Sequence, residues 1–281
     1  MSDEFFDLRP THNSHRWFLP VEPSIAAGPP DRLFLFGGVG LGAAIAAMER
    51  TLERPVVWAT AQYASFAPLG SIVDFDVREI NSGNTLTQAQ VVAHIHDQSI
   101  LVISAALGMR PGHNDQWLVA DPAPPPSECP EVQHWRAGDN RIDDRIERRL
   151  IEGRFPDGRP IAGRGDSGRV RLWLRSADGV RTSSRFLAVV ADFVVTATAH
   201  AMGRYAGGNS LDNTIRFGPI VDCEWLLCDM AIETIHNGVT HSTMKIFSED
   251  GVLMATASQS LILRLHTPDG IDRPAGAATS A

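Results

Sequence analysis

One acidic residue stands alone in a long apolar segment of the second half of the chain. Asp192 lies within FLAVVADFVVTATA, where the residues on both sides are aliphatic, aromatic or small. An ionised carboxylate in such surroundings is costly unless it is paired with another polar group. Carboxylates of this kind often act as general bases, and we expect that role for Asp192. The structural alternative is helix capping or a buried hydrogen bond.

A glycine-rich stretch in the first half imitates a nucleotide-binding motif. In RLFLFGGVGLGAA, the residues Gly38, Gly40 and Ala43 have the spacing of a dinucleotide fingerprint. A Rossmann unit would continue with a parallel strand ending in an acidic residue, whereas the following PVVWATAQYAS ends without one and leads into hairpins. We therefore expect no cofactor. The glycines either let a helix pack tightly or expose N–H groups at its start, where a carbonyl oxygen or a phosphate can dock.

Histidines occur in two places that could suggest chemistry. His94 and His96 lie two apart on one expected strand with Asp97 beside them, which is a spacing typical of metal ligands. No third and fourth ligand is visible in the sequence, so we predict no metal site. His236 and His241 flank an Asn-Gly turn and are predicted to be surface residues.

Other carboxylates and the cysteines are weaker candidates. Asp212 and Asp229 could replace Asp192 as the base, although half-exposed strand residues are the more common case. Cys223 and Cys228 could in principle carry an acyl group, but no base has a recognisable relation to them, and a buried cysteine is usually inert. The three cysteines are widely spaced and odd in number, which indicates neither a disulfide framework nor a zinc site.

Composition excludes several classes of protein. The chain has 281 residues, 43% of them hydrophobic, which is enough for a sizeable core and too many for a disordered chain. Its net charge of −8 repels phosphate backbones, so we expect no nucleic-acid partner. The acidic start, MSDEFFDLRP, and the absence of a long apolar run favour a soluble, untargeted protein of the reducing cytoplasm that has no membrane partner.

The elements that must position these residues form the same pattern twice. In the first half, Ile45, Met48 and Leu52 mark one apolar face of an Ala-rich helix. SIVDFDVREI and TLTQAQVVAHIH then alternate as strands and are joined to each other and to SILVISAALG by short turns, which require antiparallel pairing. The second half repeats a strand, an apolar helical segment and an antiparallel meander with Asn-Gly and Asp-Gly turns.

This duplication predicts an α+β fold of the tandem hotdog type, in which two antiparallel sheets each wrap around a central helix. We place the two hotdog units at residues 1–120 and 168–266, with a Pro-, Arg- and Gly-rich linker at 121–167 and a flexible tail at 267–281. The RIDDRIERRLIE part of the linker is predicted to form a short, mostly solvated helix.

Several motifs in order resemble those of a known family. The sequence has FGG before the Ala-rich helix, then FAPLGS, SGN, SLDNTIRF, EWLL, EDGVLMAT and ASQ. Together they resemble the acyl-CoA thioesterase II family, whose members carry two hotdog units in one chain. The resemblance covers roughly Leu33 to Arg264, apart from the linker.

The resemblance implies three catalytic residues that hold a water molecule. They are an Asp near the start of the second helix, a Ser or Thr on the next strand and a Gln on the last strand, which correspond to Asp192, Ser210 and Gln259. Asp192 would be the base, while Ser210 and Gln259 would orient the water. The first unit offers no carboxylate to match Asp192, so we expect one catalytic centre per chain, with the first unit supplying walls for the acyl chain.

The start of the first helix departs from the family pattern. Members commonly have FGGQ, whereas this chain has Phe36-Gly37-Gly38-Val39 and thus lacks a polar side chain there. Gly37, Gly38 and Val39 are the expected substrate-binding positions, and the valine changes the side chain that meets the substrate there.

Hydrolysis of a fatty acyl-CoA to the free acid and CoA by direct water attack is the function we expect. A non-catalytic binder of acyl thioesters is the alternative. A hotdog enoyl-thioester hydratase is less consistent with the sequence, because such enzymes typically place a His five residues after the Asp, and position 197 is Ala. Sheet edges and faces left uncovered make a homo-oligomer plausible.

Overall fold

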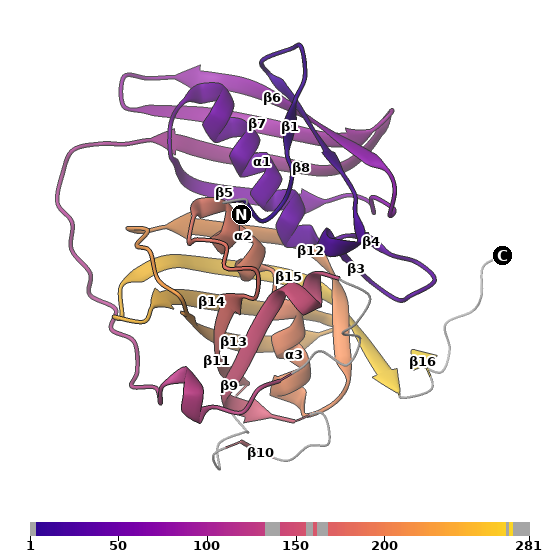
Figure 1. Ribbon diagram of the computed structural model, residues 1–281, viewed down its shortest axis with the longest axis vertical. Coiled ribbons are helices and arrows are strands. Elements are labelled where there is room, and N and C mark those ends of the chain that lie inside the picture. Colours follow the sequence, from indigo (N-terminus) through magenta and orange to yellow (C-terminus); the bar gives the residue numbers. More distant parts are fainter. Residues whose placement is uncertain (1–3, 133–140, 156–159, 162–167, 268–269, 272–281) are drawn as a thin grey trace.

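The computed structural model describes residues 4–132, 141–155, 160–161, 168–267 and 270–271 (Figure 1). The first half contains one long helix, α1 (Gly37–Leu52), and a run of antiparallel strands. These strands are β1 (Arg9–Pro10), β2 (Arg16–Pro20), β3 (Ala26–Ala27), β4 (Phe34–Leu35), β5 (Val56–Tyr63), β6 (Ile72–Ser82), β7 (Leu86–Ile95) and β8 (Gln98–Gly108).

The described residues of the second half form two consecutive short helices, α2 (Ser184–Ala191) and α3 (Val194–Met202). Its strands are β9 (Ile146–Arg154), β10 (Pro160–Ile161), β11 (Arg169–Ser176), β12 (Ala206–Phe217), β13 (Leu226–His236), β14 (Val239–Ser248), β15 (Leu253–Thr267) and β16 (Gly270–Ile271). Short 3-10 turns occur at Pro23–Ile25, Pro126–Glu128 and Ile142–Arg145. Helix and antiparallel meander thus occur twice, as the sequence predicts.

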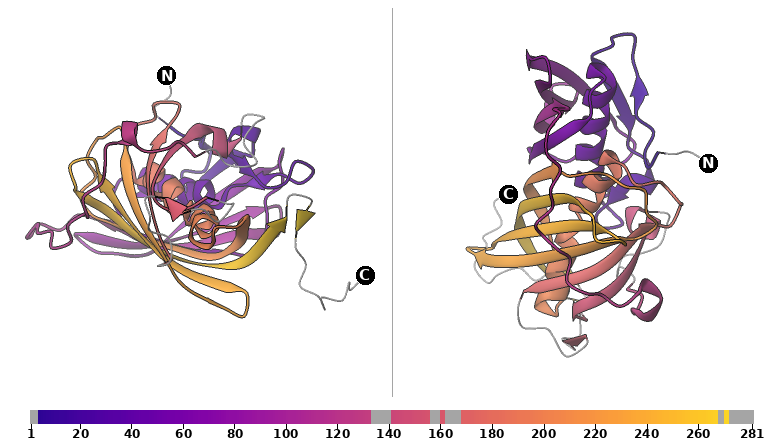
Figure 2. Two further views of the ribbon diagram at one scale, coloured as in Figure 1. Left: turned by 90° about the horizontal axis from the view of Figure 1, so that it is seen from below. Right: turned by 90° about the vertical axis from the view of Figure 1, so that its left-hand side faces the viewer.

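The two halves share one continuous sheet, which differs from the two separate sheets expected. Within the described residues the 14-stranded sheet has the order β1-β2-β6-β7-β8-β5-β12-β15-β14-β13-β11-β9-β10, with β16 on β15. β5 pairs with β12 from Trp58–Arg216 to Gln62–Asp212, and this ladder forms the seam between the halves. Short turns specify only local pairing, so the sequence did not reveal a ladder between strands about 150 residues apart. Figure 2 shows the strands curving around the helices.

Close packing of α1 against α2 joins the halves on the inner side of the sheet. A Cβ on Gly38 would lie 2.7 Å from the carbonyl oxygen of Val189, and one on Gly42 would lie 2.8 Å from that of Arg185. Glycine at these two positions lets the helix backbones approach closely. Residues 38 to 48 of α1 are all buried, as its apolar composition predicts.

The charged stretch before β11 is a strand instead of the short solvated helix expected. β9 pairs with β11, and the side chains of Ile146, Arg148 and Leu150 are buried. Arg148 is 3% exposed and sits over the ring of Phe193 at 5.5 Å. The alternation of buried and exposed residues in this strand was not recognised in the sequence, because Arg148 occupies a buried position and arginine is normally counted as a surface residue.

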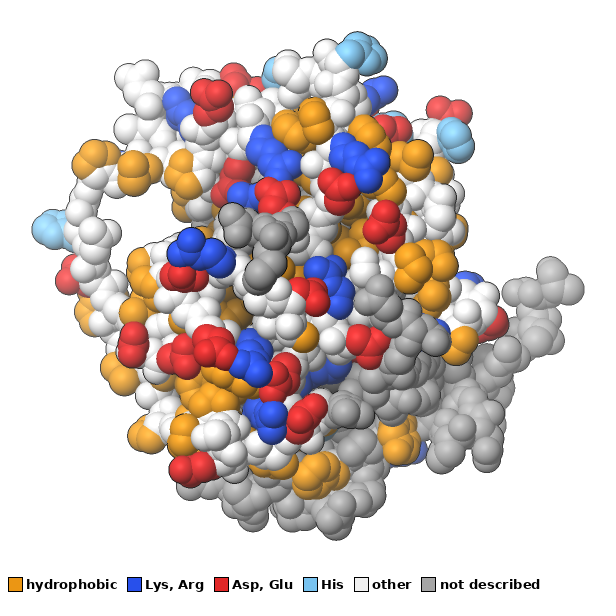
Figure 3. All heavy atoms as spheres, in the orientation of Figure 1, with side chains coloured by type: hydrophobic (Ala, Val, Ile, Leu, Met, Phe, Trp, Pro, Cys, Tyr) orange, Lys and Arg blue, Asp and Glu red, His pale blue; other side chains and the backbone are white. Residues whose placement is uncertain are grey.

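The surface and the helices give two further observations. On the face shown in Figure 3, acidic and basic side chains lie next to each other. Among the ion pairs of the described residues, Glu4 binds both Arg50 and Arg185. None of the helices in the described part of the chain is both long enough and apolar enough to span a bilayer.

Candidate active site

Asp192 lies in the break between α2 and α3. It caps the C-terminus of α2 with backbone angles of φ −85° and ψ −6°, and α3 begins two residues later. The sequence suggested one continuous apolar helix here, whereas the break turns the carboxylate toward the sheet. Asp192 is only 2% exposed.

Two strands of the second half bring the predicted partners to this carboxylate. Ser210 lies on β12 and donates a hydrogen bond from Oγ to Asp192 Oδ1 at 3.2 Å. Gln259 lies on β15 and donates from Nε2 both to Oδ1 of Asp192 and to Oγ of Ser210, the latter at 2.8 Å. The structure therefore brings together the three side chains that the resemblance singled out.

Local strand geometry explains why both partners point inward. A bulge between Ser210 and Asp212 shifts the register of β12 against β15, so that Leu211 is exposed while Ser210 reaches Asp192. On β15, Gln259 alternates with the buried Ala257 and Leu261 and is itself only 3% exposed. The sequence alone left a solvent-facing Gln259 open, and the structure excludes that alternative.

The first half of the chain contributes a backbone donor. The N–H of Gly38, at the start of α1, donates to Asp192 Oδ2 at 2.7 Å. A Cβ on Gly37 would lie 2.8 Å from the same Oδ2. Val39 is fully buried, and its N–H bonds to the carbonyl oxygen of Phe36. The first unit thus contacts the carboxylate directly, whereas the sequence led us to expect only that it lines the site of the acyl chain.

Burial sets the acidity of Asp192. Desolvation raises its pKa from the ordinary 3.8 to about 6, although the hydrogen bonds from Gln259, Gly38 and Ser210 oppose the shift. A carboxylate with a pKa near 6 is ionised at neutral pH and is a stronger proton acceptor than an exposed one.

Buried polar atoms without a partner gather around this carboxylate. Among the described residues, no hydrogen bond reaches the Tyr63 hydroxyl, either amide atom of Asn213, or Oε1 of Gln259. Asn213 pairs in register with Gln259 and is fully buried. Buried polar atoms normally have partners, so this cluster is suited to hold polar atoms of a water molecule or a substrate.

Sequence reasoning missed Tyr63 and Asn213. Asn213 belongs to the SLDNTIRF motif, and its membership of that motif is the signal that could have marked it. Tyr63 gives no such signal, because an aromatic residue at the end of an apolar strand looks like ordinary core.

Two family models match the chain in the order of its two halves. One describes an acyl-CoA thioesterase N-terminal domain and covers residues 28–109, and the other describes an acyl-CoA thioesterase C-terminal domain and covers residues 119–263. The chain belongs to the acyl-CoA thioesterase family. As a member of that family it is an acyl-CoA thioester hydrolase, and the C-terminal model includes β9, which lies in the stretch expected to be a linker.

Solved structures agree with this family. A thioesterase candidate from Novosphingobium aromaticivorans DSM 12444 is 36% identical, with a TM-score of 0.82 over 91% of this chain and 97% of its own. At 20% identity, the acyl-CoA thioesterase II TesB2 of Mycobacterium marinum has the same fold, with a TM-score of 0.71 over 93% and 97% of the two chains. A hot dog fold protein from Alicyclobacillus acidocaldarius is 17% identical and has a TM-score of 0.79 over 97% of this chain and 98% of its own. No curated protein matched the chain.

The other carboxylates have structural partners. Asp212 Oδ1 accepts from the backbone N–H of Ser260 at 2.9 Å. Asp229 forms a bidentate ion pair with Arg169 at 2.9 and 2.7 Å. Neither carboxylate is hydrogen-bonded to a second candidate residue in the described part of the chain, so Asp192 is the carboxylate of the cluster.

The histidines and cysteines of the sequence analysis lie in other surroundings. His94 binds Asp76 through Nε2 and the carbonyl oxygen of His96 through Nδ1, at 3.0 and 2.7 Å. His236 and His241 are exposed, as predicted. Burial raises the pKa of both Cys223 and Cys228, which disfavours the nucleophilic thiolate.

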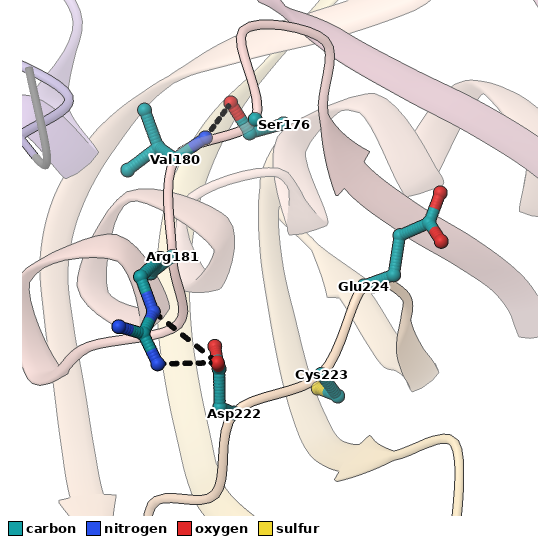
Figure 4. Close-up of a pocket in the computed structure, with 7 residues that line it drawn as sticks. Ser176, Val180, Arg181, Asp222, Cys223 and Glu224 are labelled. Carbon is teal, nitrogen blue, oxygen red and sulfur yellow. Dashed lines mark hydrogen bonds and ion pairs between the residues drawn. The ribbon is translucent and has the colours of Figure 1, made fainter. Parts of the chain in front are cut away.

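A surface hollow elsewhere shares no residue with this cluster. It measures about 290 Å³ and lies between the loop after β11 and the segment before β13 (Figure 4). Arg181 and Asp222 close one side as an ion pair, with Cys223 and Glu224 beside them. Its basic residue is already neutralised, so the hollow offers no free charge to a CoA phosphate.

Proposed function

We propose that Asp192 is the general base that activates water for direct attack on an acyl-CoA thioester. The observation that carries this proposal is a buried carboxylate bonded at once to Ser210, Gln259 and the start of α1. Its raised pKa, about 6, supports the role, because a base acts best when its pKa is close to the working pH.

Ser210 and Gln259 would hold the attacking water. Gln259 Oε1 has no hydrogen-bond partner among the described residues and can accept a hydrogen bond from one O–H of that water, while Asp192 accepts a hydrogen bond from the other O–H. The Ser210 hydroxyl can give or take a hydrogen bond as the water turns. Such positioning lowers the barrier because the reactants no longer lose freedom of motion in the transition state.

The start of α1 would bind the thioester carbonyl oxygen. Gly38 already gives its N–H to Asp192, whereas Gly37 is the first residue of the helix, so its N–H has no partner within the helix. Both the N–H and the positive end of the helix dipole favour the negative charge that develops on that oxygen. In this proposal the N–H of Gly37 binds the substrate and the N–H of Gly38 binds the base. Val39 stays a predicted contact of the substrate.

The proton balance is simple. Asp192 takes one proton from the water as the oxygen of the water bonds to the carbonyl carbon of the thioester. The tetrahedral intermediate then expels the sulfur, and the proton held by Asp192 passes to the departing thiolate. The products are the free acid and CoA, and Asp192 returns to its ionised form.

Hydrolysis of acyl-CoAs of several chain lengths, followed with a thiol reagent, tests this assignment. In Asp192→Asn we expect kcat to fall at least about 10²-fold with folding intact, because the amide keeps the shape and cannot take the proton. Asp229→Asn is the matched control, since Asp229 is a half-buried carboxylate of the same half that binds Arg169. Its kcat should stay close to that of the wild type.

Two results would contradict the proposal. A near-normal kcat in folded Asp192→Asn would show that Asp192 is not the general base. Tight binding of acyl-CoA by the wild-type protein without any turnover would leave the binder that the sequence analysis kept as an alternative.

A further inference from the structure

The hydroxyl of Tyr63 is buried and has no hydrogen-bond partner among the described residues. Tyr63 is the last residue of β5 and follows Ala59 and Ala61 on the inner face of the sheet. Part of its side chain is accessible, but the oxygen is not. An unpaired buried hydroxyl costs about 1 to 3 kcal/mol, and phenylalanine would fill the same space without that cost.

Gly37 shows where the phenol lies relative to the base. A Cβ built on Gly37 would be 2.8 Å from Asp192 Oδ2, and 3.1 and 3.2 Å from Cε1 and Cζ of Tyr63. Cζ of Tyr63, which carries the hydroxyl, and Oδ2 of Asp192 therefore both lie next to Gly37. Tyr63 and Gly37 thus lie next to Oδ2 of Asp192, whereas Ser210 and Gln259 bond to Oδ1.

We propose that Tyr63 is a further catalytic residue, whose hydroxyl donates a hydrogen bond to the thioester carbonyl oxygen together with the N–H of Gly37. This rests on the proposed function, because the bond is needed only if a tetrahedral intermediate forms. The bond strengthens as negative charge develops on the oxygen, so it stabilises the transition state more than the bound substrate.

The phenol keeps its proton under working conditions. Burial, and after it the negative charges of Asp192 and Asp212, raise the pKa of Tyr63 well above its ordinary value. A protonated phenol can donate to a carbonyl oxygen and cannot compete with Asp192 for the proton of the water.

Tyr63→Phe separates this role from packing. Loss of one donor to the oxyanion commonly costs about 10² to 10³ in kcat, and we expect a fall of that order with little change in KM. The melting temperature should stay equal or rise, because a buried unpaired hydroxyl is removed. The matched control is Tyr205→Phe, which alters the only other tyrosine of the chain and should leave kcat unchanged.

A second measurement does not depend on turnover. In Tyr205→Phe, Tyr63 is the chain's single tyrosine, so its ring carbon Cζ can be followed by NMR after ¹³C labelling. The probe is an analogue of the best-hydrolysed acyl-CoA in which CH₂ replaces the sulfur, which keeps the carbonyl and cannot be cleaved. We expect the Cζ signal to move on binding as the free hydroxyl gains an acceptor.

The outcomes distinguish the two levels of the proposal. If the wild type hydrolyses acyl-CoAs, while Tyr63→Phe retains its kcat and the Cζ signal does not move, the role of Tyr63 is wrong and that of Asp192 stands. If the wild type hydrolyses no acyl-CoA, the proposed function fails, and the role of Tyr63 fails with it.

Discussion

At the residue scale, the proposed chemistry depends on one carboxylate, Asp192, that is buried away from water. Asp192 is 2% exposed, and its hydrogen bonds do not fully offset the loss of water, so its pKa remains raised. The sequence revealed this residue because a lone charge among apolar neighbours is rare. Tyr63 and Asn213 could not be found in the same way, because an inward tyrosine or asparagine on a strand is common and only its neighbours in space give it a role.

The pKa of Asp192 predicts the dependence of activity on pH. The base must be ionised, so kcat/KM should fall about tenfold per pH unit below its pKa of about 6 and level off above it. A pH profile measured with a substrate whose own groups do not titrate in that range checks this. A profile that stays flat down to pH 4.5 would contradict ionisation of Asp192 as the controlling step.

The same shift predicts that Asp192→Asn stabilises the protein at neutral pH. Below pH 3.8 the carboxyl is protonated in both folded and unfolded chains and makes no difference. Between 3.8 and about 6 only the unfolded chain ionises freely, so the wild type loses stability as pH rises. The variant should therefore gain up to roughly 3 kcal/mol above pH 6 and nothing near pH 3.5, as measured by urea unfolding at both values. An equal gain at both pH values would point to packing instead.

At the scale of elements, the break between α2 and α3 and the glycine face of α1 are what bring Asp192 and Gly38 together. The sequence predicted the helices, the strands and the Asn-Gly turn, in which Asn237 and Gly238 have φ values of 49° and 74°. It did not predict the break, because FLAVVADFVVTATA is equally apolar on both sides of Asp192. Burial in tertiary structure, absent from local patterns, decides where this segment bends.

Gly42→Ala tests the close packing of α1 against α2. The added Cβ would lie 2.8 Å from the Arg185 carbonyl oxygen, which belongs to the backbone and cannot turn aside. We expect a loss of about 1 to 3 kcal/mol in the free energy of unfolding, despite the better helix propensity of alanine. Gly112→Ala, where no atom lies within 4 Å of the new Cβ, should be close to neutral. Equal stability of the two variants would show that the helices have room to separate.

At the scale of the whole molecule, the seam between β5 and β12 makes one body of two similar units. Turn lengths predicted each meander, and the duplication predicted two units, but pairing across the seam is a contact that no local signal reports. That the protein forms a homo-oligomer and works in the cytoplasm remain predictions.

The covalent connection across residues 109–120 is predicted to be dispensable once the chain has folded. This segment exposes Met109, Trp117 and Val119 at 77%, 86% and 78%. Cleavage by a protease that cuts after aromatic residues should occur at Trp117 and leave both fragments together and active, because the seam and the α1–α2 packing persist. Size-exclusion chromatography with an activity assay checks this. Separation of the fragments in native buffer would show that the seam is too weak to hold them.

The seam also fixes a stoichiometry. Gly38 and Tyr63 come from the first half of the chain and Asp192 from the second, so the reaction centre that we propose needs both halves and occurs once per chain. A tight inhibitor that mimics the tetrahedral intermediate should accordingly titrate one equivalent per polypeptide, half the number of repeats.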